Sequence, residues 1–289
     1  MRVLVTGSQG QLGHHMLARA PASIAVTGMS RVDCDITDLD SLRCAFRAVA
    51  PDVVINAAAY TAVDKAETDR EQAIAVNSVG AANVGAVSSE FSARTIHIST
   101  DYVFDGDASS PYQPGARARP RNAYGMTKLE GEAALSAANA NSLIVRTGWL
   151  YSARRNTFVG KILSRLRDSR EVPVVDDQTG VPTSAADLAT AIWSCLRAPS
   201  LHGVQHWVNS GTATRYEFAV RIRDRATEFG LLRNAPRIVP VSSSADKSGA
   251  FRPHYSVLDA SAMWAALGEP ARDWRDALDD VLRELAAVR

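Results

Sequence analysis

The sequence predicts an α/β protein built on a doubly wound parallel sheet, with a smaller α/β portion toward the C-terminus. Three features indicate this class. Short apolar strands alternate with helical segments through the first half, as in a series of βαβ units. A glycine-rich loop directly follows the first of these strands. The second half lacks this regular alternation and consists largely of amphipathic helices.

The first half supplies the expected strands of the sheet. Each is short, apolar and rich in β-branched residues, which is typical of a strand buried on both faces. The strands are expected at 3–6, 24–27, 53–56, 94–99 and 142–146. Helical spacing predicts helices at about 12–20, 67–90 and 122–138, the last with Asn122 as its N-cap.

In the second half of the chain, four amphipathic segments predict helices. Helices are expected at 158–170, 186–196, 216–229 and 274–287. Residues 105–121 are rich in glycine and proline and predict a loop, of a length often found at active sites.

Composition excludes several classes of protein. The 289 residues carry a formal net charge of +1, which argues against nucleic acid or an acidic membrane surface as partner. No apolar run is long enough for a transmembrane helix, and the apolar stretch at the N-terminus is too short for a signal peptide. Three scattered cysteines indicate a reducing compartment, so a cytoplasmic protein is expected.

The glycine-rich loop points to a dinucleotide. Residues 7–13 read G-S-Q-G-Q-L-G, and the glycines Gly7, Gly10 and Gly13 permit a tight turn and close approach of the backbone to a pyrophosphate. The N-terminus of the following helix offers free N–H groups to the phosphates. No acidic residue comes directly after the second strand, whereas Arg31 does, which favours NADPH over NADH. A solvated surface charge is the alternative role of Arg31.

A second motif carries proton chemistry. Tyr124 and Lys128 form Y-x-x-x-K, and this spacing places both side chains on one face of a helix. A nearby ammonium lowers the pKa of a phenol, which is ~10 in water, so the tyrosine can protonate a carbonyl oxygen as hydride arrives. Thr100 ends the fourth strand, where its hydroxyl either bonds the same carbonyl or caps its own turn.

These motifs resemble those of the extended short-chain dehydrogenases/reductases, and within them the dTDP-4-dehydrorhamnose reductase family. The resemblance spans essentially the whole chain. It rests on the glycine loop and on N-A-A-A-Y-T-A-V-D-K-A-E at 56–67, S-T-D-Y-V-F-D-G at 99–106, Y-G-M-T-K at 124–128, R-T-G-W-L-Y at 146–151, D-D-Q-T-G-V-P-T at 176–183 and R-P-H-Y-S-V-L at 252–258. It implies a Rossmann-type fold and reduction of the C4 ketone of dTDP-4-dehydrorhamnose to dTDP-L-rhamnose by NADPH or NADH.

The resemblance also implies roles for individual residues. Tyr124 would donate the proton, Lys128 would tune it and bind the nicotinamide ribose, and Thr100 would bond the carbonyl. The implied cofactor contacts are Gly7, Gly10, Gln11, Leu12, Gly13, Arg31, Asp35, Ile36, Ala59, Tyr60, Thr61, Ile98, Tyr124 and Lys128. The implied contacts of the nucleotide-sugar substrate are Thr100, Asp101, Tyr102, Trp149 and Arg252. No metal is implied, and because the family often forms homodimers, a homodimer stays open.

The expected division of the chain follows from these assignments. We expect a dinucleotide-binding domain over 1–150 and a mainly substrate-binding domain over 151–289. Residues of about 183–210 are expected to return to the first domain.

Other functions remain open at this stage. A 4,6-dehydratase is disfavoured, because Asp101-Tyr102 follows Thr100 where dehydration typically needs Asp-Glu. A 4-epimerase differs in retaining its cofactor, which a sequence does not show. A reductase that acts by the same mechanism on another dTDP-deoxysugar is a further alternative, as is a non-catalytic regulatory subunit of the kind found with methionine adenosyltransferase.

Overall fold

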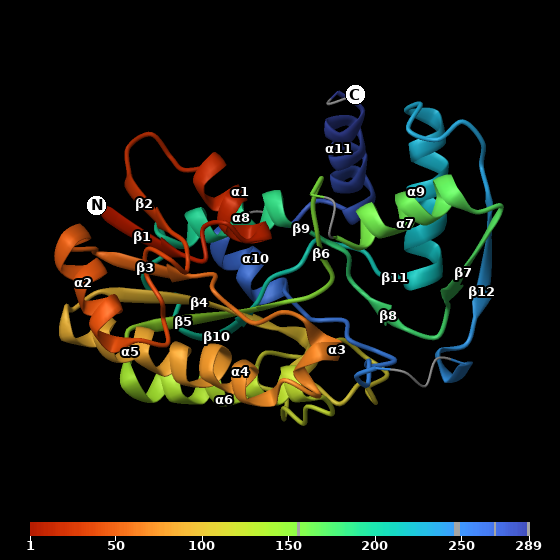
Figure 1. Ribbon diagram of the computed structural model, residues 1–289. Coiled ribbons are helices and arrows are strands. Elements are labelled where there is room, and N and C mark those ends of the chain that lie inside the picture. The colour runs from red at the N-terminus through yellow and green to blue at the C-terminus, as the bar shows by residue number, and fades with distance from the viewer. Residues whose placement is uncertain (155–156, 246–248, 269, 288–289) are drawn as a thin grey trace.

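A computed structural model describes residues 1–154, 157–245, 249–268 and 270–287 of the chain. Figure 1 shows two portions side by side: a parallel sheet with its covering helices, and a smaller group of helices and short strands from the second half of the chain. In the described residues, no helix is long and apolar enough to cross a membrane.

The sheet of the larger portion has six parallel strands. Its order is β10-β5-β4-β3-β1-β2. The strands are β1 (Arg2–Thr6), β2 (Ala25–Met29), β3 (Val53–Asn56), β4 (Arg94–Thr100), β5 (Ser142–Thr147) and β10 (Gly203–His206). The five strands predicted from the sequence are confirmed, although β2 runs two residues past its predicted end. The sixth strand arrives from much later in the chain.

Helices cover both faces of this sheet, which confirms the doubly wound class. Val3 and Val5 of β1 point toward α1 (Gln11–Ala18), α8 (Ala185–Cys195) and α10 (Ser261–Leu267). Leu4, between them, points to the opposite face, toward α2 (Leu39–Val49) and α5 (Gly80–Glu90). Since successive side chains of a strand alternate between faces, strands covered on both sides are apolar throughout.

Two of these helices were not predicted from the sequence. The helix α2 begins at an N-cap, Asp38, whose carboxylate accepts hydrogen bonds from the Asp40 and Ser41 backbone N–H groups. This capping signal is readable in the sequence. The short helix α10 has no side-chain cap and is positioned by packing against the sheet.

The long helix predicted at 67–90 is broken into segments. It consists of α4 (Arg70–Ile74), a π-helical turn η1 (Ala75–Val79) and α5, and α3 (Val63–Ala66) precedes it. The π-helical turn carries a buried asparagine, Asn77, whose Nδ2 donates to the Tyr60 carbonyl and to the Thr127 hydroxyl, each at 3.1 Å. This turn therefore ties the loop after β3 to α6 (Ala123–Ala138), the helix that carries Tyr124 and Lys128.

The smaller portion packs around its own apolar core. Its helices α7 (Phe158–Asp168), α9 (Arg215–Glu228) and α11 (Trp274–Ala287) agree with the predicted segments. A parallel pair, β7 (Glu171–Val175) with β12 (Arg237–Val241), was not predicted, because its two strands lie far apart in the chain. The remaining elements are short: β6 (Leu150–Tyr151), β8 (Thr179–Gly180), β9 (Thr183–Ser184), β11 (Ala213–Thr214), η2 (Asp101–Val103) and η3 (Ser243–Ala245).

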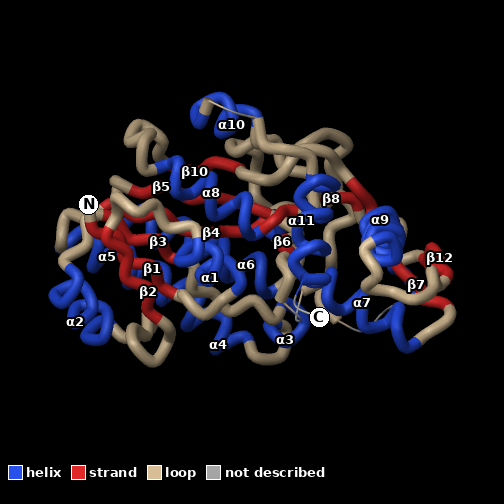
Figure 2. Tube along the Cα trace, turned by 90° about the horizontal axis from the view of Figure 1, so that it is seen from above, coloured by secondary structure: helices blue, strands red, loops and turns tan. Residues whose placement is uncertain are grey.

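The chain crosses between the two portions more than once. After α7 and β7 it returns through β9 and α8 to the larger portion, and then runs back to α9 (Figure 2). The Trp193 indole of α8 donates to the Met16 carbonyl of α1 at 3.0 Å, which secures α8 on the sheet.

Candidate active site

A cleft of about 600 Å³ lies at the carboxyl ends of β1 and β3, where the strand order of the sheet reverses. This is the usual ligand-binding place in such sheets. We call it the strand-end cleft. It is lined by the predicted cofactor contacts Gly7, Gly10, Arg31, Asp35, Ile36, Ala59 and Tyr60, together with Gln9, Ser30, Cys34, Ala57, Ala58, Lys65, Asp69, Gln72 and Val76.

The glycine loop leaves room and hydrogen-bond donors for a pyrophosphate. Gly7 has a φ of +68°, and a Cβ there would lie 2.6 Å from the Ala58 backbone nitrogen. Gly10 begins α1 without a side-chain cap, so no side chain occupies the first N–H groups of the helix. Gln11 is not among the residues that line the cleft, but its side-chain nitrogen Nε2 is buried without a hydrogen-bond partner among the described residues. This orphaned donor beside an uncapped helix end fits the phosphates of a dinucleotide.

Other predicted cofactor contacts lie outside the wall of this cleft. Leu12 packs in the core between α1 and the sheet. Gly13 serves close packing, since a Cβ there would lie 2.2 Å from the Gly7 carbonyl oxygen. Thr61 is exposed, and the Ile98 carbonyl accepts a hydrogen bond from Lys128.

Arg31 stands on the rim of the strand-end cleft. Its side chain is 70% exposed, and its Nε lies 3.3 Å from Asp35 Oδ2. The neighbouring Ser30 hydroxyl donates to Asp33 at 2.6 Å, so that acid is already engaged. A cation and a hydroxyl at this edge suit the 2′-phosphate of NADP.

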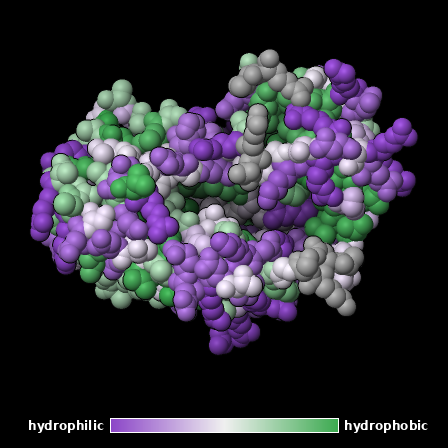
Figure 3. Space-filling model, viewed as in Figure 1, coloured by the Kyte–Doolittle hydropathy of each residue, from purple (hydrophilic) through white to green (hydrophobic). Residues whose placement is uncertain are grey.

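A second cleft, of about 880 Å³, lies between the two portions of the molecule. Figure 3 shows the corresponding face hollowed near its middle, with hydrophilic side chains around the hollow. Among the residues that the structure describes, four cations line it: Lys161, Arg165, Arg215 and Arg252. We call it the basic cleft, and its charge suits an anionic ligand such as a diphosphate.

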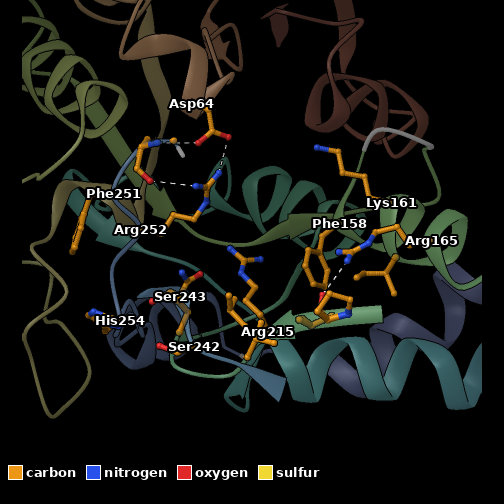
Figure 4. A pocket seen from close by; sticks show the side chains of 18 of the residues that line it. Asp64, Phe158, Lys161, Arg165, Arg215, Ser242, Ser243, Phe251, Arg252 and His254 are labelled. Atoms are coloured by element: carbon orange, nitrogen blue, oxygen red, sulfur yellow. Dashed lines mark hydrogen bonds and ion pairs between the residues drawn. The ribbon is translucent and has the colours of Figure 1, made fainter. Parts of the chain in front are cut away.

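Arg215 is a cleft residue that the sequence analysis missed. It reaches into the middle of the basic cleft, between Arg252 and Phe158 (Figure 4). Its guanidinium carbon lies 3.5 Å from the centroid of the Trp149 ring. The capping box of Thr214 and Glu217, which marks the start of α9, is the only sequence signal near it.

Trp149 and Arg252, both predicted substrate contacts, lie near Arg215. Trp149 has a φ of +46°, and its indole packs so closely on Gly180 that a Cβ there would lie 2.4 Å from the ring. A non-glycine residue in this backbone region is strained and occurs preferentially at functional sites. Arg252 lines the cleft but also forms an ion pair of 2.7 Å with Asp64.

Tyr124 lies between the two clefts. Its ring meets that of Tyr102, which lines the basic cleft, edge to face at 6.0 Å. It also packs in one small apolar cluster with Tyr60, which lines the strand-end cleft. Thr100 lies close enough to affect the pKa of the Tyr124 phenol. Its hydroxyl donates to Asp101 Oδ1 at 3.1 Å and accepts from the Tyr102 N–H at 3.2 Å, so in this structure it also caps its own turn.

Asp101 is buried beside this pair. Burial raises the pKa of its carboxyl to about 6, and hydrogen bonds from Ser256 and Thr100 oppose that shift. A carboxyl with this pKa holds a proton more readily than an ordinary aspartate and is suited to hydrogen bonds with sugar hydroxyls.

Lys128 points away from the phenol and toward β4. Its Nζ donates to the Ile98 carbonyl at 2.7 Å and lies 3.2 Å from His97 Nε2. Burial lowers the pKa of Lys128 to about 8, whereas burial raises the pKa of Tyr124 above its usual value. The lowered tyrosine pKa predicted from the i,i+4 spacing is therefore not found in this arrangement, because desolvation of the buried phenol dominates and Lys128 faces β4 instead.

A buried ion pair supports the site from behind. Glu132, one turn after Lys128 on α6, accepts a hydrogen bond from the Ser99 hydroxyl and pairs with Arg146 of β5 at 2.6 Å. All three side chains are buried. They tie the ends of β4 and β5 to α6, which places Thr100 beside Tyr124. The sequence analysis did not predict this set.

Comparison with known proteins agrees with this geometry. A family model described as RmlD substrate binding domain matches residues 1–287. The chain belongs to this family. The match confirms the resemblance predicted from the sequence motifs.

Several known proteins are similar to this chain over most or all of their length. A probable dTDP-4,6-dihydroxy-2-methyloxan-3-one 4-ketoreductase of Streptomyces antibioticus is 38% identical over 100% of this chain and 97% of its own. A dTDP-4-dehydrorhamnose reductase of Mycolicibacterium smegmatis is 39% identical over 97% of this chain and 85% of its own. The crystal structure of dTDP-4-dehydrorhamnose reductase from Bacillus anthracis, in complex with NADP, superposes with a TM-score of 0.92 at 32% identity, covering 98% of this chain and 99% of that one.

Proposed function

We propose that this RmlD-family chain reduces the C4 ketone of dTDP-4-dehydrorhamnose to dTDP-L-rhamnose with NADPH. The observation that carries the proposal is the position of Tyr124, which lies between a cleft suited to a dinucleotide and a basic cleft suited to a nucleotide sugar. The names of the M. smegmatis and B. anthracis relatives support the substrate, and the NADP complex of the latter supports the cofactor.

The strand-end cleft would hold the cofactor, which supplies the hydride. The uncapped start of α1 and the Gln11 amide would bind its pyrophosphate. Asp35 and Ile36 would meet the adenine, and Arg31 its 2′-phosphate. Ala59 and Tyr60, after β3, would flank it further along the cleft.

The basic cleft would hold the nucleotide sugar. Arg215, Lys161 and Arg252 provide the cations for its diphosphate. Asp101 and Trp149 do not line this cleft themselves but lie close to Arg215, which does, and Tyr102 of the same cleft contacts Tyr124. This arrangement would direct the keto sugar toward the phenol and leave the base in the outer part of the cleft.

Proton transfer then follows from the chemistry of Tyr124. Its raised pKa keeps the phenol protonated at neutral pH. When hydride reaches C4, the ketone oxygen becomes an alkoxide, which is far more basic than a phenolate. The Tyr124 O–H bond breaks and its proton passes to that oxygen, which Thr100 holds in place by a hydrogen bond.

We also propose a division of labour along the chain. Residues 1–150, with about 183–210, would form the part that binds the cofactor, and the rest of 151–289 would mainly bind the substrate. The pairing of β10 with β5 and the packing of α8 on α1 support this division.

The test follows nicotinamide oxidation by absorbance. Purified protein receives dTDP-4-dehydrorhamnose, made enzymatically from dTDP-glucose, with NADPH or NADH. Rapid oxidation with dTDP-rhamnose as the product, lost in Tyr124→Phe, is the expected result. Absence of turnover despite cofactor binding would overturn the reductase assignment and favour an epimerase or a regulatory subunit.

A second candidate is a 4-ketoreductase for another dTDP-deoxysugar. The S. antibioticus relative, which covers the whole chain, carries such a name. Analysis of the product formed from several dTDP-4-keto sugars separates the two candidates, because both share the same proton donor.

Location and assembly complete the proposal. Cys34, Cys44 and Cys195 are all free thiols, which supports a cytoplasmic enzyme. A homodimer is the assembly that the family resemblance favours, and light scattering of the purified protein measures it directly.

A further inference from the structure

A series of buried, hydrogen-bonded polar side chains runs behind the active site from β1 to Lys128. The Thr6 hydroxyl donates to Asn56 Oδ1 at 2.7 Å, and Asn56 Nδ2 lies 3.0 Å from His97 Nδ1. The other ring nitrogen, His97 Nε2, lies 3.2 Å from Lys128 Nζ. Each of these four side chains is at most 1% exposed. These hydrogen bonds thus connect three neighbouring strands to the helix that carries Tyr124.

The direction of these hydrogen bonds is set at Asn56. A backbone N–H can only donate, and the N–H of Ala58 points to Asn56 Oδ1 at 3.2 Å. The oxygen of the amide therefore faces Ala58 and Thr6, and its NH₂ group faces His97. Because that NH₂ group donates, His97 Nδ1 must accept.

The tautomer of His97 follows from this direction. Burial, reinforced by Lys128, holds the pKa of His97 well below its usual range, so the ring is neutral and carries one proton. With Nδ1 as the acceptor, that proton is on Nε2. The ring therefore presents an N–H, rather than a lone pair, to Lys128 Nζ.

We propose that His97 is a positioning residue for the reductase reaction: held by Asn56 as the Nε2–H tautomer, it directs an N–H at Lys128 and so favours the neutral amine over the ammonium. The inference rests on the proposed function in treating Lys128 as part of the reductase site. A neutral amine accepts this hydrogen bond with its lone pair and still donates to the Ile98 carbonyl at 2.7 Å. An ammonium has no lone pair, so it would place N–H against N–H.

The other groups that face Lys128 do not reverse this preference. Glu132, on the same helix, favours the ammonium, but Arg146 of β5 and the Ser99 hydroxyl of β4 already engage its carboxylate. From η1 the neighbouring side chain is the neutral Asn77, which bonds Thr127. Burial acts in the same direction as His97 and lowers the pKa of Lys128 to about 8. Lys128 can therefore exchange its proton near physiological pH.

Nuclear magnetic resonance of the wild-type protein tests the inference without any turnover. The chain has six histidines and only four lysines, Lys65, Lys128, Lys161 and Lys247, so ¹⁵N-histidine and ¹³Cε-lysine labelling give few signals. We assign the Lys128 signal by its loss in Lys128→Arg and the His97 signal by its loss in His97→Gln. We expect His97 as the Nε2–H tautomer from pH 6 to 9, and Lys128 titrating near 8. An Nδ1–H tautomer, an imidazolium, or a Lys128 signal that titrates with the exposed Lys161 would overturn the proposal.

The Asn56→Asp variant tests whether Asn56 sets the tautomer of His97 and thereby the pKa of Lys128. A carboxylate at this position accepts from Nδ1, so His97 should switch to the Nδ1–H tautomer and offer its Nε2 lone pair to an ammonium. The pKa of Lys128 should then rise by about one unit or more. A rise in the pKa of Lys128 without a change in the tautomer of His97 would be an effect of the added charge alone and would count against the proposal. If the variant does not fold, the tautomer of His97 measured in the wild-type protein decides whether the proposal holds.

The assay of the proposed function is a separate readout. The pH dependence of kcat should move with the Lys128 pKa in Asn56→Asp. If the protein turns over no keto sugar, the two resonance measurements still stand, so failure of the proposed function and failure of this inference are distinguishable.

Discussion

Arg215 lies over the indole of Trp149, with its guanidinium carbon 3.5 Å from the ring centroid. The contact joins the first residue of α9 to the loop after β5, and so crosses between the two portions of the molecule. The indole also packs closely on Gly180. The stack holds a cation in place in the basic cleft before any ligand arrives, which reduces the entropy lost on binding.

This relationship predicts the effect of removing the cation. Arg215→Ala should raise the KM for the nucleotide sugar by roughly 10- to 100-fold, because a charge-assisted hydrogen bond contributes about 1.5–3 kcal/mol. The KM for NADPH should stay within a factor of two to three, since Arg215 does not line the strand-end cleft. Arg223→Ala on the same helix, whose guanidinium pairs with Asp224, is the matched control. Equal effects of both changes on KM would exclude Arg215 as a phosphate contact.

Removing the phenolic hydroxyl should abolish most of the turnover. We expect Tyr124→Phe to lower kcat by about 10²- to 10⁴-fold, the usual contribution of a general acid, while NADPH still binds. Stopped-flow kinetics and a fluorescence titration with NADPH measure the two effects. The control is Tyr216→Phe, whose ring packs against the core of the smaller portion. A kcat near that of wild type would assign the proton donor to another group.

The choice of cofactor should depend on Arg31. We expect Arg31→Ala to raise the KM for NADPH by about fivefold, because an exposed cation on a phosphate contributes on the order of 1 kcal/mol. The KM for NADH should hardly change, since NADH has no 2′-phosphate. Arg47→Ala, an exposed arginine of α2, is the control. Equal losses with both cofactors would mean that Arg31 acts on the fold of the loop.

The buried pair of Glu132 and Arg146 should be a large contributor to stability. Glu132→Ala leaves a buried guanidinium without its partner and should lower the free energy of unfolding by about 3–5 kcal/mol. The exposed pair of Arg43 and Glu90 has a similar separation, 2.8 Å, so Glu90→Ala is a matched comparison and should cost less than about 1 kcal/mol. Urea unfolding measures both. Similar costs would show that Glu132 does not anchor α6.

The free energy of unfolding should fall at acidic pH, because unfolding lets the buried His206 ring bind a proton. The ring is fully buried, and burial, then Arg146, lowers its pKa to about 4. The unfolded chain binds this proton at about pH 6.5, so the contribution of the neutral ring is complete above that pH and is lost as pH falls toward 4. Relative to His206→Leu, the wild type should lose up to about 3 kcal/mol between pH 7 and 4. Thermal unfolding across this range measures the difference. Parallel pH profiles for the two proteins would contradict it.

The fold was largely predictable because its signals are local. Apolar strands followed by helices predict a parallel sheet, and the glycines after β1 predict the place of the strand-end cleft. The misses have physical reasons. The π-helical turn η1 looks like ordinary helix in sequence, and the strands β7 and β12 pair across more than sixty residues of chain.

In the candidate site, too, local features were predictable from the sequence and long-range contacts were not. By itself the sequence determined the class of fold, and it predicted the dinucleotide loop and the roles of Thr100, Tyr124 and Lys128, since each of these signals is a short local motif. Only the tertiary structure decided that Arg215 stacks on Trp149, that Glu132 binds Arg146 and Ser99, and that Lys128 faces His97. These contacts join elements distant in sequence, and burial, which sets their charge states, exists only once the chain has packed.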